Sequence, residues 1–232
     1  MRVASIVLAA GSSQRFGGRP KQFETLGEHT VLRHAVRSFL DVDRVEELWV
    51  VTSEEHERAT REVLGGVPIS GVVIGGAARS ESTLRALESV GPDVTHVLVH
   101  DAARPLLPRS TVERCLDALE VADVVATVLP PADTVVVLDE EGEDVVSMPD
   151  RDRVRLHQTP QGFRRQLLAD AWARTSDDPR PTPTDDVTAV LRGFPDETVA
   201  WVTGDRRTMK VTHPDDLTVL RAFAESWDPD LG

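Results

Sequence analysis

A glycine-rich stretch with several cations follows the first apolar run of the sequence. Residues 8–23, LAAGSSQRFGGRPKQF, contain three glycines, two arginines and one lysine, but no carboxylate. Glycines let a phosphate approach the backbone amides closely, because no side chain intervenes. Arg15 could hold phosphate oxygens through paired hydrogen bonds, and Lys21 could act as a point charge. The stretch predicts a loop for a flexible polyanion such as a triphosphate, with a solvated surface loop as the alternative.

The glycine spacing differs from that of two common phosphate-binding loops. The dinucleotide fingerprint needs G-x-G-x-x-G, whereas Gly11 is followed only by Gly17 and Gly18. The P-loop needs G-K-[ST], whereas Arg19 and Pro20 follow the last glycine. This spacing argues against an NAD-dependent oxidoreductase.

Composition and charge limit the classes of partner. The formal net charge of −13 argues against general binding to nucleic acid or to an anionic membrane, since both need a positive field. Cys115 is the single cysteine, which excludes an internal disulfide and any site with several cysteine ligands. The first apolar run leads into the glycine-rich stretch rather than a cleavage site, and no run reaches the roughly 20 residues of a membrane span. We expect a soluble, cytoplasmic protein.

Short β-branched runs alternate with helical patterns through the first half of the chain. The strand-like runs are residues 3–9, 47–52, 71–76, 95–101 and 122–129, and the helical patterns are residues 30–40, 53–65, 80–91 and 110–120. This alternation predicts an α/β fold with a doubly wound, mostly parallel sheet. Ligands bind beyond the carboxyl ends of the strands in such sheets, and the glycine-rich stretch begins at one of those ends.

The pattern changes after Pro130. Residues 133–148 read as two short strands around a turn at Gly142, which predicts a β-hairpin. An isolated hairpin is marginal in water, so it must pack either on a second subunit or on the parent sheet. We expect one domain over residues 1–232, with the hairpin as an arm at about residues 131–156. The remaining elements expected are helices over residues 164–175 and 185–193, a strand over 198–205, and a last helix with Thr212 and Asp215 as a capping box.

Five motifs resemble a known family of enzymes. After the glycine-rich stretch come HDAARP (100–105), HQTPQGF (157–163), PTDD (183–186) and MKVTHPDDL (209–217). Their order and spacing resemble the 2-C-methyl-D-erythritol 4-phosphate cytidylyltransferase family, from Val3 to about Leu220. The resemblance implies a Rossmann-like fold whose β-arm forms a homodimer. It also implies transfer of CMP from CTP to 2-C-methyl-D-erythritol 4-phosphate in non-mevalonate isoprenoid biosynthesis, with Mg²⁺ as cofactor and pyrophosphate as the second product.

Two other functions remain as alternatives. A cytidylyltransferase for another polyol phosphate, such as ribitol 5-phosphate, would carry very similar CTP motifs. A non-catalytic nucleotide-binding module could keep the same fold, although the retention of Arg15, Lys21, Asp101 and Lys210 argues against it.

The resemblance assigns the cations to the phosphates. Because the attacking phosphate and CTP are both anionic, catalysis should depend on positioning and charge neutralisation rather than on a general base. Arg15 and Lys21 would stabilise the transition state at the CTP phosphates, and Lys210 would hold the α-phosphate. His100 and His157 are expected to be structural.

The resemblance also assigns residues that position the acceptor. These are Arg151 on the arm, preferred over Arg153, together with Asp101, Arg104, Thr159 and Thr184. Asp101 could also contact Mg²⁺, and Arg151 is expected to reach the acceptor phosphate of the neighbouring subunit. From the residues alone, a helix cap is the first interpretation of Thr184, and a solvated arm residue is the preferred interpretation of Arg151.

The segment IGGAARSESTL (74–84) is similar to the family's base-recognition motif, G-G-x-x-R-x-x-S. The implied nucleotide-binding residues are Ala10, Gly11, Gly75, Gly76 and Ser82. Backbone groups suit this task, because telling cytosine from uracil needs a fixed pattern of donors and acceptors.

Overall fold

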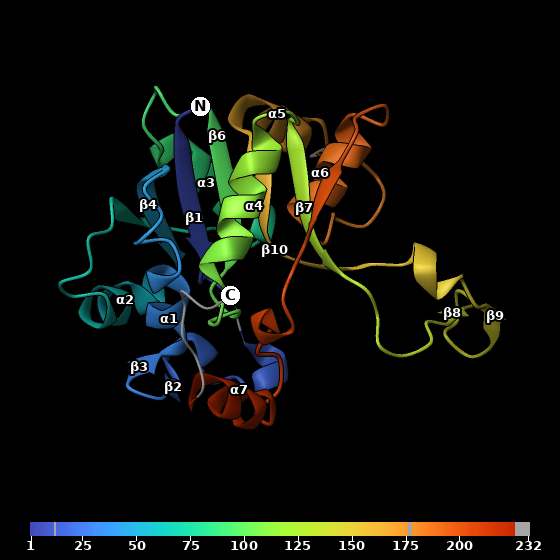
Figure 1. The fold of residues 1–232 in the computed structure, drawn as a ribbon, viewed down its shortest axis with the longest axis horizontal. Coiled ribbons are helices and arrows are strands. Elements are labelled where there is room, and N and C mark those ends of the chain that lie inside the picture. Colours follow the sequence, from blue (N-terminus) through green and yellow to red (C-terminus); the bar gives the residue numbers. More distant parts are fainter. Residues whose placement is uncertain (12, 176–177, 226–232) are drawn as a thin grey trace.

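A seven-stranded sheet forms the centre of the molecule. The computed structural model describes residues 1–11, 13–175 and 178–225. The strands are β1 (Val3–Leu8), β4 (Val45–Thr52), β5 (Gly71–Ile74), β6 (His96–Asp101), β7 (Val124–Leu129), β10 (Leu156–Arg164) and β11 (Ala200–Thr203). Their order is β11-β7-β10-β6-β1-β4-β5 (Figure 1). Among these described strands, only β10 runs antiparallel to its neighbours, so the predicted mostly parallel α/β fold is confirmed.

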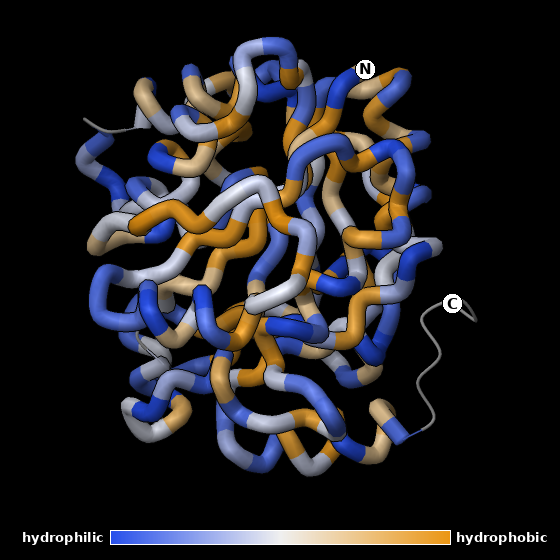
Figure 2. Tube along the Cα trace, turned by 90° about the vertical axis from the view of Figure 1, so that its left-hand side faces the viewer, coloured by the Kyte–Doolittle hydropathy of each residue, from blue (hydrophilic) through white to orange (hydrophobic). Residues whose placement is uncertain are grey.

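Helices cover both faces of the sheet. Along β1, Val3 and Val7 enter the core on one face and Ala4 and Ile6 the core on the other, because successive side chains of a strand point to opposite faces. The first face is covered by α1 (Val31–Arg37), α2 (Glu57–Val63) and α4 (Arg109–Leu119). The second is covered by α3 (Arg79–Ser89), α5 (Arg165–Thr175) and α6 (Asp186–Gly193). Figure 2 accordingly shows hydrophobic segments running through the middle of the molecule.

Strand β10 is the element that the sequence pattern does not predict. It carries the HQTPQGF motif and pairs with both β6 and β7 near the middle of the sheet. Its pairing with β7 breaks between Gln158 and Gly162, where Pro160 lies. Proline cannot donate a ladder hydrogen bond, so it argues against a central strand unless the register is interrupted, as it is here.

Two predicted helix starts are wrong in detail. Asp185, not Thr184, caps α6, since its carboxylate accepts from the Thr188 N–H at 2.8 Å. The last helix, α7, spans Asp216–Glu225. Asp216 rather than Asp215 accepts from the backbone of Thr212, at 2.7 Å, so the expected capping box does not form. The end of the predicted last helix lies outside the described residues.

The predicted hairpin is confirmed as a projecting arm. Strands β8 (Val137–Leu138) and β9 (Val145–Ser147) pair antiparallel in a two-stranded sheet of their own. Figure 1 shows this arm standing out from the central sheet. The apolar side chains exposed on it are Val136, Val137, Leu138, Val145, Val146 and Met148. A 3-10 turn, η4 (Arg151–Arg153), leads back toward β10.

Shorter elements complete the described chain. They are β2 (Thr25–Leu26), β3 (His29–Thr30), and the 3-10 turns η1 (Gln14–Phe16), η2 (Lys21–Phe23), η3 (Glu54–His56) and η5 (Arg206–Thr208). Among the described residues, no helix has the length and apolar character needed to cross a membrane.

Candidate active site

A cavity of about 570 Å³ lies at the carboxyl edge of the central sheet. Three of its walls are residues 8–11 at the end of β1, residues 76–79 after β5, and residues 101–103 at the end of β6. Because these strands are parallel, their carboxyl ends meet at one edge. Residues 13–16 and 21–22, together with Ser82, Lys210 and Thr212, close the rest. The site therefore lies where doubly wound sheets bind ligands.

The glycine-rich loop is anchored below this edge by a small apolar cluster. Phe16 is buried with Val211, Leu217 and Leu220, among other residues of the cluster. The loop turns at Gly17, whose φ of 82° lies in the left-handed region that favours glycine. This anchoring fixes the flanking turns η1 and η2, whose residues Arg15 and Lys21 line the cavity.

The three predicted phosphate-binding cations converge on this cavity. Arg15, Lys21 and Lys210 all line it, although they come from three separate turns or segments. The Lys21 Nζ donates to the carbonyl of Val211 at 2.6 Å. Burial, followed by the charges of Lys210 and Arg15, lowers the pKa of Lys21 to about 8. Within the described residues, neither Arg15 nor Lys21 forms an ion pair with a carboxylate, so both charges are available to an anion.

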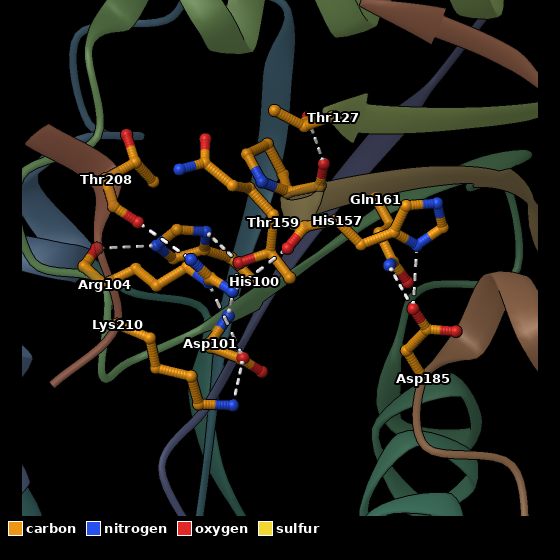
Figure 3. A network of polar contacts seen from close by, with 12 residues as sticks. His100, Asp101, Arg104, Thr127, His157, Thr159, Gln161, Asp185, Thr208 and Lys210 are labelled. Atoms are coloured by element: carbon orange, nitrogen blue, oxygen red, sulfur yellow. Dashed lines mark hydrogen bonds and ion pairs between the residues drawn. The ribbon is translucent and has the colours of Figure 1, made fainter. Parts of the chain in front are cut away.

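Asp101 is surrounded by cations at the centre of the site. Its Oδ1 accepts from Arg79 Nη1 at 2.6 Å, and its Oδ2 accepts from Lys210 Nζ at 2.7 Å. The Nε of Arg104 lies 3.8 Å from the same Oδ2. Burial alone would raise the pKa of Asp101, but Arg79, Lys210 and Arg104 outweigh it and hold the pKa well below its usual range. The carboxylate is therefore ionised at neutral pH, and Figure 3 shows its hydrogen bond with Lys210.

Arg79 is a site residue that the sequence analysis did not single out. Its guanidinium bridges Asp101 and Asp186, with Nη2 donating to Asp186 Oδ2 at 2.7 Å. Asp186 is fully buried and also accepts from Thr83 Oγ1 at 3.1 Å and Trp172 Nε1 at 3.0 Å. The arginine of the G-G-x-x-R motif was a signal for this role, but nothing in the sequence pointed to Asp186 as its partner.

A chain of hydrogen bonds behind the cavity fixes the backbone of Asp101. The Asp101 N–H donates to Thr159 Oγ1 at 3.1 Å, and Thr159 lies 2.9 Å from His100 Nδ1. His100 Nε2 faces the Arg104 carbonyl at 3.0 Å. Because a carbonyl only accepts, Nε2 carries the proton and Nδ1 accepts from the threonine hydroxyl. Burial lowers the pKa of His100 to about 4, so the ring is neutral, as suits a structural role.

The base-recognition segment is held rigidly beside the cavity. The Gly76 N–H donates to Ser82 Oγ at 3.2 Å, and the Ala77 N–H donates to Glu81 Oε2 at 2.9 Å. A Cβ at Gly76 would lie 2.2 Å from the Cβ of Glu81, which cannot swing away, so this close approach requires glycine. Gly76 and Ser82 line the cavity, as do Ala10 and Gly11. Gly75 lies immediately behind them, where a Cβ would meet Ser82 Oγ at 2.6 Å.

Four predicted acceptor residues do not line the cavity of the single chain. Arg104 donates to the carbonyl of Thr208 at 2.9 Å, and Thr159 is buried in the chain of hydrogen bonds described above. Thr184 is exposed, next to the capping Asp185. Arg151 is exposed at the base of the arm. Their assignment to the acceptor stays a prediction.

The site offers few ligands for a metal ion. In the described parts of the chain, no group of three or more His, Cys, Asp or Glu side chains could hold one. Asp101 is the one carboxylate among the described residues that line the cavity. Mg²⁺ is commonly held by one or two carboxylates together with the phosphates of a substrate. The donor set therefore fits Mg²⁺ bound mainly through a nucleotide, and does not fit a metal held by protein alone.

Comparison with known proteins gives a consistent result. A family model described as "2-C-methyl-D-erythritol 4-phosphate cytidylyltransferase" matches residues 3–226. The enzyme of that name from Thermobifida fusca is 41% identical over 231 residues, covering 96% of this chain and 93% of the relative. The structure of 4-diphosphocytidyl-2C-methyl-D-erythritol synthase from Anaerococcus prevotii is similar with a TM-score of 0.86 and 26% identity, covering 96% of each chain. The cytidylyltransferase structure from Thermus thermophilus gives a TM-score of 0.78 and 31% identity, covering 97% of this chain and all of that one.

Proposed function

Because the chain belongs to the 2-C-methyl-D-erythritol 4-phosphate cytidylyltransferase family, we propose that it transfers CMP from CTP to 2-C-methyl-D-erythritol 4-phosphate and releases pyrophosphate. The observation that carries the proposal is the convergence of Arg15, Lys21 and Lys210 on one cavity at the carboxyl edge of the sheet. Both substrates carry phosphate, and such a cluster offsets their mutual repulsion.

The reaction needs charge neutralisation more than proton transfer. A phosphate oxygen of the acceptor attacks the α-phosphorus of CTP, and the bond to the β-phosphate oxygen breaks as pyrophosphate leaves. The attacking oxygen is already ionised, so no general base is required. Arg15 and Lys21 stabilise the charge on the triphosphate and the leaving group.

Lys210 takes the place nearest the reacting phosphorus. In the free protein its ammonium is held by Asp101 at 2.7 Å. An α-phosphate in the cavity would share that ammonium, while Arg79 and Arg104 continue to balance the Asp101 carboxylate. Asp101 thus keeps Lys210 oriented before the nucleotide arrives, so little reorganisation is needed in the transition state.

Mg²⁺ is the proposed cofactor, and Asp101, the one carboxylate among the described residues that line the cavity, would contact it beside the nucleotide phosphates. When bound, it would draw negative charge from the CTP phosphate oxygens. Cytosine would be read by the backbone at Ala10, Gly11, Gly75 and Gly76, with Ser82 holding that backbone in place.

The arm supports a proposed homodimer. Its exposed apolar side chains would be covered by a second copy of the chain, since a two-stranded hairpin is marginal alone. Arg151 stands at the base of this arm, outside the cavity of its own chain. It would therefore act on the acceptor phosphate in the site of the partner.

A panel of polyol phosphates tests the proposal. The purified protein is incubated with CTP, Mg²⁺ and either 2-C-methyl-D-erythritol 4-phosphate or ribitol 5-phosphate, and pyrophosphate release is followed. We expect kcat/KM at least about 100-fold higher for the methylerythritol substrate, a discrimination of about 2.7 kcal/mol. Preference for ribitol 5-phosphate would overturn the choice of acceptor. CTP binding without turnover of any polyol phosphate would identify a non-catalytic module instead.

A further inference from the structure

The lysine side chains of this chain are concentrated in one place. The sequence contains two lysines, Lys21 and Lys210, and all its other basic side chains apart from histidine are arginines. Both lysines line the same cavity. Arginine stays protonated and is a poor nucleophile, so these two side chains and the terminal amine are the chain's candidates for amine chemistry.

The two lysines differ in their ability to react. Lys210 donates to the Asp101 carboxylate at 2.7 Å, so its nitrogen is engaged in an ion pair that must break before it can attack an acyl group. Lys21 donates to a neutral carbonyl, that of Val211, at 2.6 Å. A neutral amine still has N–H donors for that hydrogen bond, although the bond is weaker than that of an ammonium. Lys21 can therefore lose its proton without losing its partner.

The charged groups around Lys21 further favour the neutral amine. Arg15 and Lys210 repel its proton, whereas Asp101 and Asp216 attract it, and burial is the largest effect. The resulting pKa of about 8 leaves about a quarter of the amine neutral at pH 7.5, against about one in a thousand for an ordinary lysine. A half-buried amine in a cation-lined cavity is thus both nucleophilic and placed where anions collect.

We propose that Lys21 is an acylation site for small acyl phosphates, and that its acylation switches the enzyme off. The phosphate of the reagent would bind beside Arg15 and Lys210, which places its acyl carbon within the same cavity as the Lys21 amine. The Nζ lone pair forms a C–N bond with the acyl carbon, and the C–O bond breaks with its electrons leaving on inorganic phosphate. The proton released by the amine passes to phosphate or solvent.

The loss of activity follows from the charge of the product. An amide is neutral, so acylated Lys21 no longer offsets the charge of a triphosphate. This part of the inference rests on the proposed function, whereas the chemical labelling does not. The two parts can therefore fail separately.

Acetyl phosphate is the probe. The protein is incubated with it at pH 7.5, and acetylation of Lys21, Lys210 and the terminal amine is followed by peptide mass spectrometry. We expect Lys21 to be acetylated at least about tenfold faster than Lys210, and saturating CTP to slow the reaction at Lys21 at least about tenfold, since both ligands need the same cations. Equal rates at the two lysines, or no protection by CTP, would overturn the assignment.

A neutral reagent separates reactivity from anion binding. With the N-hydroxysuccinimide ester of acetate, the rate at Lys21 relative to the terminal amine should be at least about fivefold lower than with acetyl phosphate, because the ester gains nothing from the cationic cavity. An equal ratio for the two reagents would show that the cavity does not recruit the phosphate and would overturn the proposal.

Two variants localise the chemistry. Lys21→Arg should remove most of the CTP-sensitive acetylation and leave only the slower reaction at Lys210, whereas Asp101→Asn should speed acetylation of Lys210, because the ion pair at 2.7 Å is lost. Circular dichroism checks the fold of each variant. If Asp101→Asn does not fold, the acetylation rates of the wild-type protein with and without CTP still decide the proposal. A rate of CTP-sensitive acetylation in Lys21→Arg equal to that of the wild-type protein would contradict the proposal.

Activity measured on the same samples completes the test. Residual pyrophosphate release should fall in proportion to the fraction of unmodified Lys21. Full activity in fully acetylated protein would overturn the switch. Wild-type protein without turnover on any polyol phosphate would instead overturn the proposed function, and the labelling rates would still decide whether Lys21 is the acylation site.

Discussion

Replacing Asp186 by asparagine tests whether Arg79 and Asp186 form a strongly coupled, fully hydrogen-bonded charge pair behind the site. The Asp186 carboxylate is 0% exposed and accepts from Arg79 on one oxygen and from Thr83 and Trp172 on the other. An asparagine side chain at this position would have nearly the same shape, but one of its two terminal atoms is an NH₂ donor. The substitution thus changes charge and hydrogen bonding with little change in packing.

Neither orientation of the asparagine satisfies its surroundings. In either orientation Arg79 loses one of its two counter-charges, and if the NH₂ group faces Arg79, two donors also meet. If it faces the other side, it meets the Trp172 Nε1–H, which can only donate. Breaking a buried charge pair by removing one partner costs about 3–5 kcal/mol. The Arg79 side chain is 24% exposed, so solvent screens this pair only weakly. We expect Asp186→Asn to lower the free energy of unfolding by about 3–5 kcal/mol.

Urea denaturation at 25 °C, followed by tryptophan fluorescence, measures the effect. Thr83→Val is the matched control, because it removes a single hydrogen bond to the same carboxylate at 3.1 Å and should cost about 1 kcal/mol. A loss below about 1 kcal/mol for Asp186→Asn, equal to that of the control, would refute the view that Arg79 and Asp186 form a strongly coupled pair.

Three further predictions concern the cations and the arm. Lys21→Ala should lower kcat by about 100- to 1000-fold with an unchanged circular dichroism spectrum, because it removes charge stabilisation in the transition state; unchanged turnover would remove Lys21 from the mechanism. Because the pKa of Lys21 is about 8 in the free protein, kcat/KM for CTP should fall about tenfold per pH unit above pH 8, as the ammonium becomes neutral. Lys21→Arg should shift that decline to higher pH, since a guanidinium stays charged; an identical decline in this variant would assign it to another group. Mixing Arg151→Ala and Lys21→Ala subunits should restore part of the activity, since one of the two sites in each heterodimer would be intact; no recovery in confirmed heterodimers would argue against a shared site.

The sequence predicted those parts of the site that follow directly from where a strand ends in a parallel sheet. A strand ending at Leu8 and a second ending at Asp101 must bring their carboxyl ends together in a parallel sheet, so the loop cations and Asp101 could be expected at one edge. Local composition also predicted the arm, whose two strands are close in the sequence and joined by a turn at Gly142.

The parts that sequence reasoning missed depend on contacts between distant segments. Strand β10 contains Pro160, which local propensity places in a loop, and its place in the sheet comes from pairing with β6 and β7 on both sides. The bridge from Arg79 to Asp186 joins residues 107 positions apart, so no local spacing indicates it. The residue that caps α6 is Asp185, one position after the predicted Thr184. This difference depends on the backbone angles at the helix start.

A crystal structure with CTP and Mg²⁺ tests the central claim most directly. The account predicts the triphosphate in the cavity at the carboxyl edge of the sheet, with the side-chain nitrogens of Arg15, Lys21 and Lys210 within hydrogen-bonding distance, about 3.2 Å, of its oxygens. A triphosphate bound at another face of the molecule, or bound in the cavity with these three side chains turned away from it, would contradict the account.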